Sequence, residues 1–259
     1  MKISTIIIAY NEAKNISDAV CSVKFADEVI VVDNGSKDNT GEIARKSGAK
    51  IITLEKNLGY SEAKKIALRK CSNDWVFWLD CDERVSPKLA DEIIATINDD
   101  KNLDNICAFE IPRRSFFIDK LIRHSGWGNE TVVRLFRKDC AKFSDNLVHE
   151  GLIVDGKIAS MKNPILHYTA PDFKSFYDKQ IRYAHLSAEQ MVRDNVKVNF
   201  AKILVHPIAA FFKTFLIKLG FLDGVEGFQI AMINFIYVFT KYSDAYYLQR
   251  NKNTMEKRI

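Results

Sequence analysis

The segment from Trp75 to Glu83 constrains the fold of this chain most strongly, because a wholly apolar run ends abruptly in acidic residues. Asp80, Cys81 and Asp82 close the run and place two carboxylates one residue apart. An unbroken apolar run is typical of a strand buried on both faces of a parallel sheet. Two carboxylates at its end predict a site for a divalent cation, with a solvated strand end as the alternative.

Two further apolar runs, nearer the N-terminus, also end in polar residues. Lys2–Tyr10 leads into Asn11 and Glu12, and Glu28–Asp33 leads into a turn rich in Gly, Ser, Asp and Asn. Each run precedes a stretch with helical periodicity, and a shorter strand at Lys50–Leu54 continues the alternation. The pattern predicts an α/β fold with a mainly parallel central sheet covered by helices on both faces.

Open parallel sheets bind their ligands beyond the carboxyl ends of the strands. Asn11–Glu12, Asp33 and Asp80–Asp82 all lie at predicted strand ends, so we expect them to meet in one crevice. The glycine spacing of a dinucleotide fold or a P-loop is missing there. A diphosphate would therefore be held through Mg²⁺ or Mn²⁺, which bridges it to the carboxylates.

Three segments resemble the signature segments of family 2 glycosyltransferases with the GT-A fold: Thr5–Glu12, Val31–Thr40 and Trp78–Glu83. Four others are similar to the branch that builds the lipopolysaccharide core, in particular the β-1,4-glucosyltransferases that extend the inner-core heptose. These are Gly126–Gly128, Arg134–Asp139, Leu147–Glu150 and Ile165–Tyr168.

The resemblance implies a role for each residue of the crevice. The residues that bind the nucleotide sugar are then Ala9, Tyr10, Asn11, Glu12, Asp33 and Asp80. Among them, Asp33 hydrogen-bonds the uracil and Asp80 faces the ribose. Asp82 is the expected direct metal ligand, and the further candidate ligands are Asp80, His149 and His167. A hydrogen-bonded core histidine is the alternative for His167. Cys81 stands where this branch usually has a small residue, and its side chain is expected to point into the protein.

The chemistry calls for one base in addition to the metal. Departure of a nucleoside diphosphate leaves an oxocarbenium-like sugar, and a carboxylate on the opposite face deprotonates the acceptor hydroxyl, which inverts the configuration. The candidate acids are Glu130, Asp139, Asp145 and Glu150, and the resemblance favours Glu150. A loop acid paired with Arg134 or Arg137 is the alternative for Glu150. Both arginines could also neutralise phosphates or lie on a solvated face.

The pattern divides the chain into three parts. Residues 1–115 form the donor-binding α/β half, and 116–170 form a strand-rich acceptor half of the same GT-A domain, with Asp155–Gly156 as a hairpin turn. Residues 171–259 form a helical extension. Its apolar blocks are interrupted by charges, so no transmembrane helix is predicted. One helical face carries Lys202, His206 and Lys213, as in a helix that lies at a membrane surface. The alternative is that these helices pack on the donor domain or on a second subunit.

The composition indicates the cellular compartment and the kind of partner. The five cysteines are scattered, odd in number and without a Cys-x-x-Cys pair. They argue against a zinc site or a disulfide framework and for a reducing compartment. The first apolar run is too short for a signal peptide, which predicts a cytoplasmic protein. The net charge of +5 is dispersed along the chain, and it favours an anionic membrane surface over nucleic acid as partner.

Together these features predict a metal-dependent, inverting glycosyltransferase at the cytoplasmic face of the inner membrane. The resemblance implies that it moves a hexose, glucose from UDP-glucose, onto the inner-core heptose of a lipid-linked oligosaccharide acceptor. One alternative keeps the chemistry and changes the acceptor to polyprenyl phosphate, a peptide or another glycan. Another is a non-catalytic sugar-nucleotide-binding protein. A nucleotidyltransferase is disfavoured because the first loop is neither Gly-rich nor basic.

Overall fold

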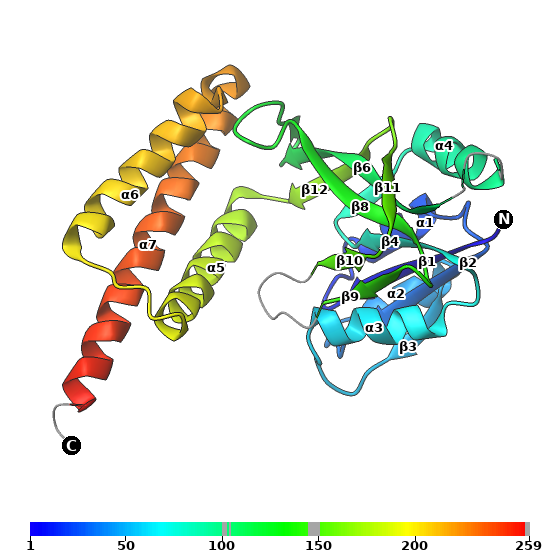
Figure 1. Cartoon of the computed structure of the whole chain (residues 1–259), viewed down its shortest axis with the longest axis horizontal. Helices are drawn as coiled ribbons and strands as arrows, with labels where there is room; N and C mark the ends of the chain where they lie inside the picture. Colours follow the sequence, from blue (N-terminus) through cyan, green and yellow to red (C-terminus); the bar gives the residue numbers. More distant parts are fainter. Residues whose placement is uncertain (100–102, 104, 145–150, 257–259) are drawn as a thin grey trace. The chain divides into compact units, whose positions relative to one another are not determined.

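The computed structural model describes residues 1–99, 103, 105–144 and 151–256, and they form two compact units (Figure 1). Unit 1 comprises Met1–Arg114 and Glu130–His167. Unit 2 comprises Ser115–Asn129 and Tyr168–Ile259. Each unit has its own core and is described by itself.

The sheet of unit 1 is mainly parallel at its centre. The path through the ten-stranded sheet runs β3 (Lys50–Thr53), β2 (Glu28–Asp33), β1 (Ile3–Ala9), β4 (Trp75–Asp80), β8 (Glu130–Arg137), β6 (Ile106–Phe117), β12 (Ile165–Ala170) and β5 (Glu83–Val85). Off this path, β7 (Lys120–Leu121) and β11 (Lys157–Ser160) pair with β6. The first four strands of the path are parallel, whereas β8 is antiparallel to both β4 and β6.

Side chains of β1 alternate between two cores. Ile3 and Ile7 belong to one cluster, and Ile6 and Ile8 to the other. The helices α1 (Ile16–Ser22), α2 (Thr40–Lys46) and α4 (Pro87–Asn98) contribute to the first cluster. Helix α3 (Tyr60–Lys70) contributes to the second. Ser4 and Thr5 are the polar members of this strand, and both are fully buried. A strand with a buried layer on each face carries mostly apolar residues, and the predicted parallel sheet covered on both faces is confirmed.

The predicted hairpin turn at Asp155–Gly156 is wrong. The strands on either side of it lie in different sheets: β10 (Leu152–Val154) pairs with β9 (Ala141–Phe143), and β11 pairs with β6. Gly156 has φ +140°, and a Cβ there would lie 2.4 Å from Cys107 Sγ. This glycine therefore allows a close approach to the β6 strand rather than a two-residue turn.

Glu28, at the start of β2, anchors the amino end of the sheet. It is buried and accepts hydrogen bonds from Lys50 Nζ (2.8 Å), Ser4 Oγ (2.7 Å) and both the backbone N–H and the hydroxyl of Ser72. Burial alone would raise the pKa of Glu28, but these donors outweigh it and lower the pKa to about 2. The ionised carboxylate therefore stabilises the fold.

We expect Glu28→Gln to lower the free energy of unfolding at pH 7 by about 2 kcal/mol, since hydrogen bonds to a charged group are lost. The depressed pKa fixes the sign of the pH dependence. The stabilisation is present above about pH 4.5, the carboxyl's ordinary pKa, and disappears as the pH falls toward about 2. Urea unfolding at pH 7, 4 and 3 should show wild type and variant converging at low pH. A gap that stays constant with pH would contradict this account.

Unit 2 is helical. Helices α5 (Phe173–Arg193) and α6 (Phe200–Phe212) both pack against α7 (Gly224–Glu256). Between α6 and α7 lie the short turns η2 (Lys213–Ile217) and η3 (Gly220–Asp223). A small core joins these helices to the segment before Asn129, and its buried members are Phe117, Ile122, Phe176, Ile230 and Ile233.

The prediction that charges leave no helix of transmembrane length needs correction. Among the described residues, Phe200–Ile217 and Gly220–Asn251 are each long and apolar enough to cross a membrane by length and composition. A buried core helix can pass the same test, but only 17% and 33% of the two windows are buried. The charges at Lys202 and Lys213 do not interrupt the first helical segment, because helical geometry continues through both of them.

Candidate active site

The three predicted parts of the site lie at the carboxyl ends of neighbouring strands. In the sheet register Ala9 is opposite Asp33, and Ile8 is opposite Asp80. The order β2-β1-β4 therefore places Asp33, the Tyr10–Glu12 segment and Asp80 along one edge of the sheet. The structure brings these parts together as the strand pattern predicts.

The segment after β1 is tied to the turn after β2. The Asn11 backbone N–H donates to Ser36 Oγ (2.9 Å), and the Lys37 N–H donates back to Asn11 Oδ1 (2.8 Å). Asn11 adopts φ +56°, a left-handed conformation that asparagine tolerates. The Glu12 N–H donates to Thr40 Oγ1 (2.8 Å). These bonds fix Asn11 and Glu12 beside the end of β2.

Asp33 is held at the end of β2 with little freedom. Its side chain accepts from the Ser36 N–H (3.0 Å), and the residue is 7% exposed. A Cβ on Gly41 would lie 2.7 Å from Asp33 Oδ2, so α2 can approach this carboxylate only with glycine at that position. The next residue, Asn34, is fully buried and bonds Asn57, Leu58 and Gly59. Asn34 thereby fixes the loop before α3, a role that the sequence reasoning missed.

Asp80 is oriented by two neighbours. Trp78 Nε1 donates to Asp80 Oδ1 (3.0 Å), and Arg134 Nη2 pairs with Asp80 Oδ2 (2.5 Å). The guanidinium carbon of Arg134 also lies 4.0 Å from the centre of the Trp78 ring. The carboxylate nevertheless remains 39% exposed, so it can still reach a ligand from a fixed position.

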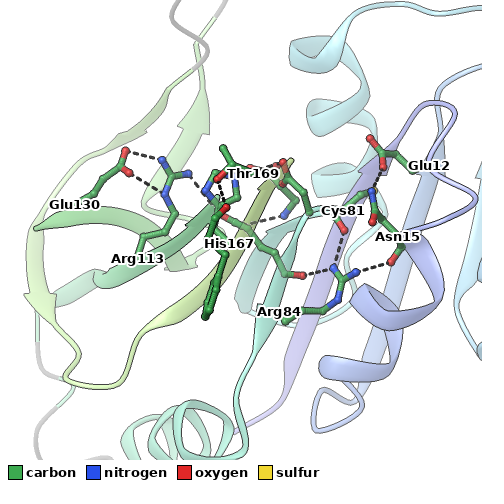
Figure 2. Close-up of polar contacts among 12 residues, drawn as sticks. Glu12, Asn15, Cys81, Arg84, Arg113, Glu130, His167 and Thr169 are labelled. Atoms are coloured by element: carbon green, nitrogen blue, oxygen red, sulfur yellow. Dashed lines mark hydrogen bonds and ion pairs between the residues drawn. The ribbon is translucent and has the colours of Figure 1, made fainter. Parts of the chain in front are cut away.

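Behind Asp80 lies a chain of charged side chains that the sequence did not predict, and its first two members, Arg134 and Glu83, are buried. Arg134 Nη2 pairs with Glu83 Oε1 (2.7 Å), and Arg113 Nη1 lies 3.5 Å from the same oxygen. Arg113 in turn binds both carboxylate oxygens of Glu130, as Figure 2 shows. Burial and the nearby Asp80 raise the pKa of Glu83, and Arg134 counteracts this by stabilising the ionised form. Burial opposes the charge of Arg134, but the carboxylates of Asp80 and Glu83 raise its pKa above the ordinary value.

Arg84 clamps the Asp80–Asp82 turn to the segment after β1. Its Nη1 donates to the carbonyls of Cys81 and Glu83 (both 2.7 Å), and its Nη2 donates to the Asn15 carbonyl (3.1 Å; Figure 2). Cys81 itself points inward as expected, because its Sγ lies 3.3 Å from the Ile8 carbonyl and it is 5% exposed. Burial raises the pKa of the Cys81 thiol. The sequence signal for Arg84 is its place directly after three acids in four residues.

Asp82 and His167 come together although they are far apart in sequence. Strand β12 runs antiparallel to β5, with His167 opposite Glu83, and His167 Nε2 lies 3.3 Å from Asp82 Oδ2. Among the described residues, no group of three or more His, Cys, Asp or Glu side chains could hold a metal ion. A carboxylate oxygen and an imidazole nitrogen nevertheless suit Mn²⁺, and Mg²⁺ or Mn²⁺ commonly takes one or two protein ligands and completes its shell with phosphate and water. The donor set therefore fits a cation bound together with a diphosphate.

The remaining candidate acids and histidine are either outside the described residues or paired with arginine. Asp145, His149 and Glu150 lie outside the described residues. The carboxylate of Glu130 is engaged by Arg113, and that of Asp139 by Arg137. Arg134 is 3% exposed, so its place on a solvated face is excluded.

Comparison with known proteins identifies the family. The family model for glycosyl transferase family 2 matches residues 4–163. The chain belongs to glycosyltransferase family 2. This glycosyltransferase is 34% identical over 245 residues to an uncharacterized glycosyltransferase of Rickettsia conorii, covering 90% of this chain and 85% of the relative. It is also 26% identical over 248 residues to the lipopolysaccharide core biosynthesis glycosyltransferase LpsC of Rhizobium meliloti, covering 92% and 90%.

A solved structure supports the GT-A fold of this glycosyltransferase. The mannosyltransferase PcManGT of Pyrobaculum calidifontis, in complex with GDP-Man and Mn²⁺, superposes with a TM-score of 0.57. The match covers 94% of this chain and 86% of that chain, at 13% identity. The expected fold, a mainly parallel GT-A sheet with a C-terminal helical extension, is confirmed.

Proposed function

We propose that this glycosyltransferase moves glucose from UDP-glucose, with inversion, onto the inner-core heptose of a lipid-linked oligosaccharide. The observation that carries the donor half is the carboxyl edge of the sheet, where Asp33, Asp80 and the Asp82–His167 pair follow neighbouring strands. The acceptor half is supported by similarity to LpsC along nearly the whole chain.

Each residue at this edge has a chemical task in the proposal. Ala9 and Tyr10 line the nucleotide pocket, Asn11 and Glu12 fix its rim, and Asp33 accepts from the uracil. Asp80, held by Trp78 and Arg134, accepts from the ribose hydroxyls. Asp82 and His167 would hold Mg²⁺ or Mn²⁺, which when bound neutralises the charge of the departing diphosphate. Glu150, outside the described residues, stays the proposed base that deprotonates the acceptor hydroxyl.

The experiment is transfer to defined acceptors, followed by mass spectrometry for the added hexose and by NMR of its anomeric proton for the configuration. The protein is incubated with UDP-glucose and Mn²⁺, and with a lipid A-linked acceptor that ends in the inner-core heptose. The control acceptor is the same molecule without that heptose. Polyprenyl phosphate is the third acceptor, and it tests the alternative substrate. The proposal requires one added hexose on the first acceptor alone, joined in the β configuration. Transfer only to polyprenyl phosphate, or to no acceptor, would overturn the proposed substrate.

A lipid-linked acceptor requires the protein to work at a membrane surface, and unit 2 offers a suitable one. Large apolar side chains are exposed along α6, the turns that follow it and the start of α7, among them Phe212 (50%), Ile217 (77%), Leu222 (57%) and Val225 (68%). Lys213 and Lys218 lie in the same segment and are exposed. Exposed apolar residues interspersed with lysines favour an anionic bilayer over bulk water. This surface supports our proposal that the enzyme works at the cytoplasmic face of the inner membrane.

Ile217→Asp should weaken binding to phosphatidylglycerol-containing vesicles about tenfold, because it removes one inserted apolar side chain and adds a negative charge. Vesicle co-sedimentation measures the effect, and Ile158→Asp, an equally isolated change at an exposed position of unit 1, is the control. Unchanged vesicle binding together with a smaller mass in solution would instead assign this surface to a second subunit.

A further inference from the structure

Unit 2 contains a cavity that the donor site does not explain. It has a volume of about 270 Å³, and we call it the Trp127 pocket. Its lining includes the rings of Trp127 and Phe176 and the polar side chains of Gln180, Thr214, Lys218 and Asn234. The lining includes two residues of the Gly126-Trp127-Gly128 motif, which the donor site leaves unused.

The rim of the pocket holds an unusual backbone. Ser125 (φ +57°) and Leu219 (φ +55°) are non-glycine residues in the left-handed region, and Gly126 (φ +90°) stands beside Ser125. The Ser125 N–H donates to the Lys218 carbonyl (2.9 Å), which joins the two strained segments. Such conformations cost about 1–3 kcal/mol each and persist where the surroundings over-determine them, which is common at ligand sites.

A buried carboxylate supplies that support. Asp223 is 3% exposed and accepts from the backbone N–H groups of Arg123 and His124 and from Ser125 Oγ (2.8 Å). The acid is therefore occupied in fixing the loop, and it is not among the residues that line the pocket. The rim is preorganised before any ligand arrives.

The side chains that line the pocket suit a ligand with hydroxyl groups and a negative charge. Lys218 extends over Gly126, where a Cβ would lie 2.5 Å from Lys218 Nζ. None of the described residues that line the pocket is acidic, so Lys218 gives it a net positive charge. The Gln180 amide makes no hydrogen bond to the residues that the structure describes, whereas Asn234 Nδ2 donates to Thr214 Oγ1 (2.8 Å). Amides and a hydroxyl beside the rings of Trp127 and Phe176 suit the polar edge and apolar face of a sugar ring.

We propose that the Trp127 pocket binds a sugar residue that carries a phosphate or carboxylate group, with the anion paired to Lys218 and the ring against Trp127. The suggestion that the bound sugar is part of the acceptor rests on the proposed function. The proposed binding of a sugar does not depend on that function, because every side chain that would bind it lies in unit 2.

Indole N–H signals of the full-length protein test the pocket directly. The chain has three tryptophans, Trp75, Trp78 and Trp127, and Trp127→Phe assigns the signal of interest. Glucose 6-phosphate is the probe, and glucose and inorganic phosphate are the comparisons. We expect glucose 6-phosphate to move the Trp127 signal saturably and to bind about tenfold more tightly than glucose, as one charge-assisted contact would give. The signals of Trp75 and Trp78 should not move.

Two lysine variants complete the test. Lys218→Met should reduce the affinity for glucose 6-phosphate to that for glucose, and Lys213→Met, an exposed lysine outside the pocket lining, should leave it unchanged. The inference is overturned if glucose 6-phosphate does not move the Trp127 signal, if glucose binds equally well, or if inorganic phosphate alone gives the same shift. UDP-glucose binding to Lys218→Met, measured separately with Mn²⁺, should equal that of the wild type. Failure of the donor site therefore stays distinguishable from failure of the pocket.

Discussion

Asp82→Ala should lower kcat/KM for UDP release from UDP-glucose by about 10³-fold, the scale seen when one charge-stabilising group is removed from a reaction centre. Asp82 is the expected metal ligand, and its carboxylate faces His167 at the open edge of the sheet. Its side chain is 26% exposed, so the substitution leaves no cavity in the core. The loss should therefore appear in turnover while the melting temperature changes little.

Turnover with Mn²⁺ in excess is the measurement, and Asp91→Ala is the control. Asp91 is an exposed acid of α4, so its removal changes the charge equally without touching the site. Activity of Asp82→Ala within threefold of the wild type would remove Asp82 from the reaction centre. That result would favour the alternative interpretation, in which Asp82 is a solvated acid at the end of a strand and has no role in the reaction.

Arg134→Met should destabilise unit 1 by about 3–5 kcal/mol, because it leaves Asp80 and Glu83 without their shared buried partner. Glu83 is fully buried, and only Arg113, at 3.5 Å, would remain as a cation near its carboxylate in the described structure. Methionine preserves much of the apolar volume against Trp78, so the loss reports the charge rather than a cavity. For a chain of this size the melting temperature should fall by roughly 10 °C.

Arg137→Met is the matched control. It lies on the same strand and pairs with Asp139, but that pair is solvated, with the two side chains 40% and 63% exposed. Surface pairs contribute about 0–1 kcal/mol, so this variant should unfold close to the wild type. Equal melting temperatures for the two variants would show that burial of the Asp80–Arg134–Glu83 cluster does not set its energetic contribution.

The donor half of the fold could be read from the sequence because its signals are local. β1 and β4 carry buried apolar residues on both faces, and side-chain carboxylates and amides first appear where each strand ends. Parallel neighbours then place Asp33 and Asp80 at one edge without further information. Helix α4 likewise begins at Pro87, directly after its N-cap Ser86, whose side chain accepts from the Leu89 N–H.

The charge chain behind the site could not be read in the same way. Arg134 reaches Asp80 and Glu83 only because β8 inserts beside β4 in antiparallel register, a pairing across more than fifty residues. The pairing register of β8 with β4 depends on the whole sheet, so no short sequence pattern reveals it. The pairing of His167 with Asp82 depends in the same way on β12 meeting β5. The strands around Gly156 misled the prediction, since a two-residue polar turn looks alike whether the strands it joins pair with each other or with different partners.

The measurement that tests the central claim most directly is calorimetric titration of the wild-type protein with UDP-glucose in Mn²⁺ and then in EDTA. UDP-galactose and UDP-N-acetylglucosamine serve as comparisons. A metal-bridged nucleotide-sugar site at the carboxyl edge of β1, β2 and β4 requires binding in Mn²⁺ that EDTA abolishes, with UDP-glucose the tightest of the three. Equal binding in EDTA, or no binding of any of the three sugars, would contradict the site as it is assigned.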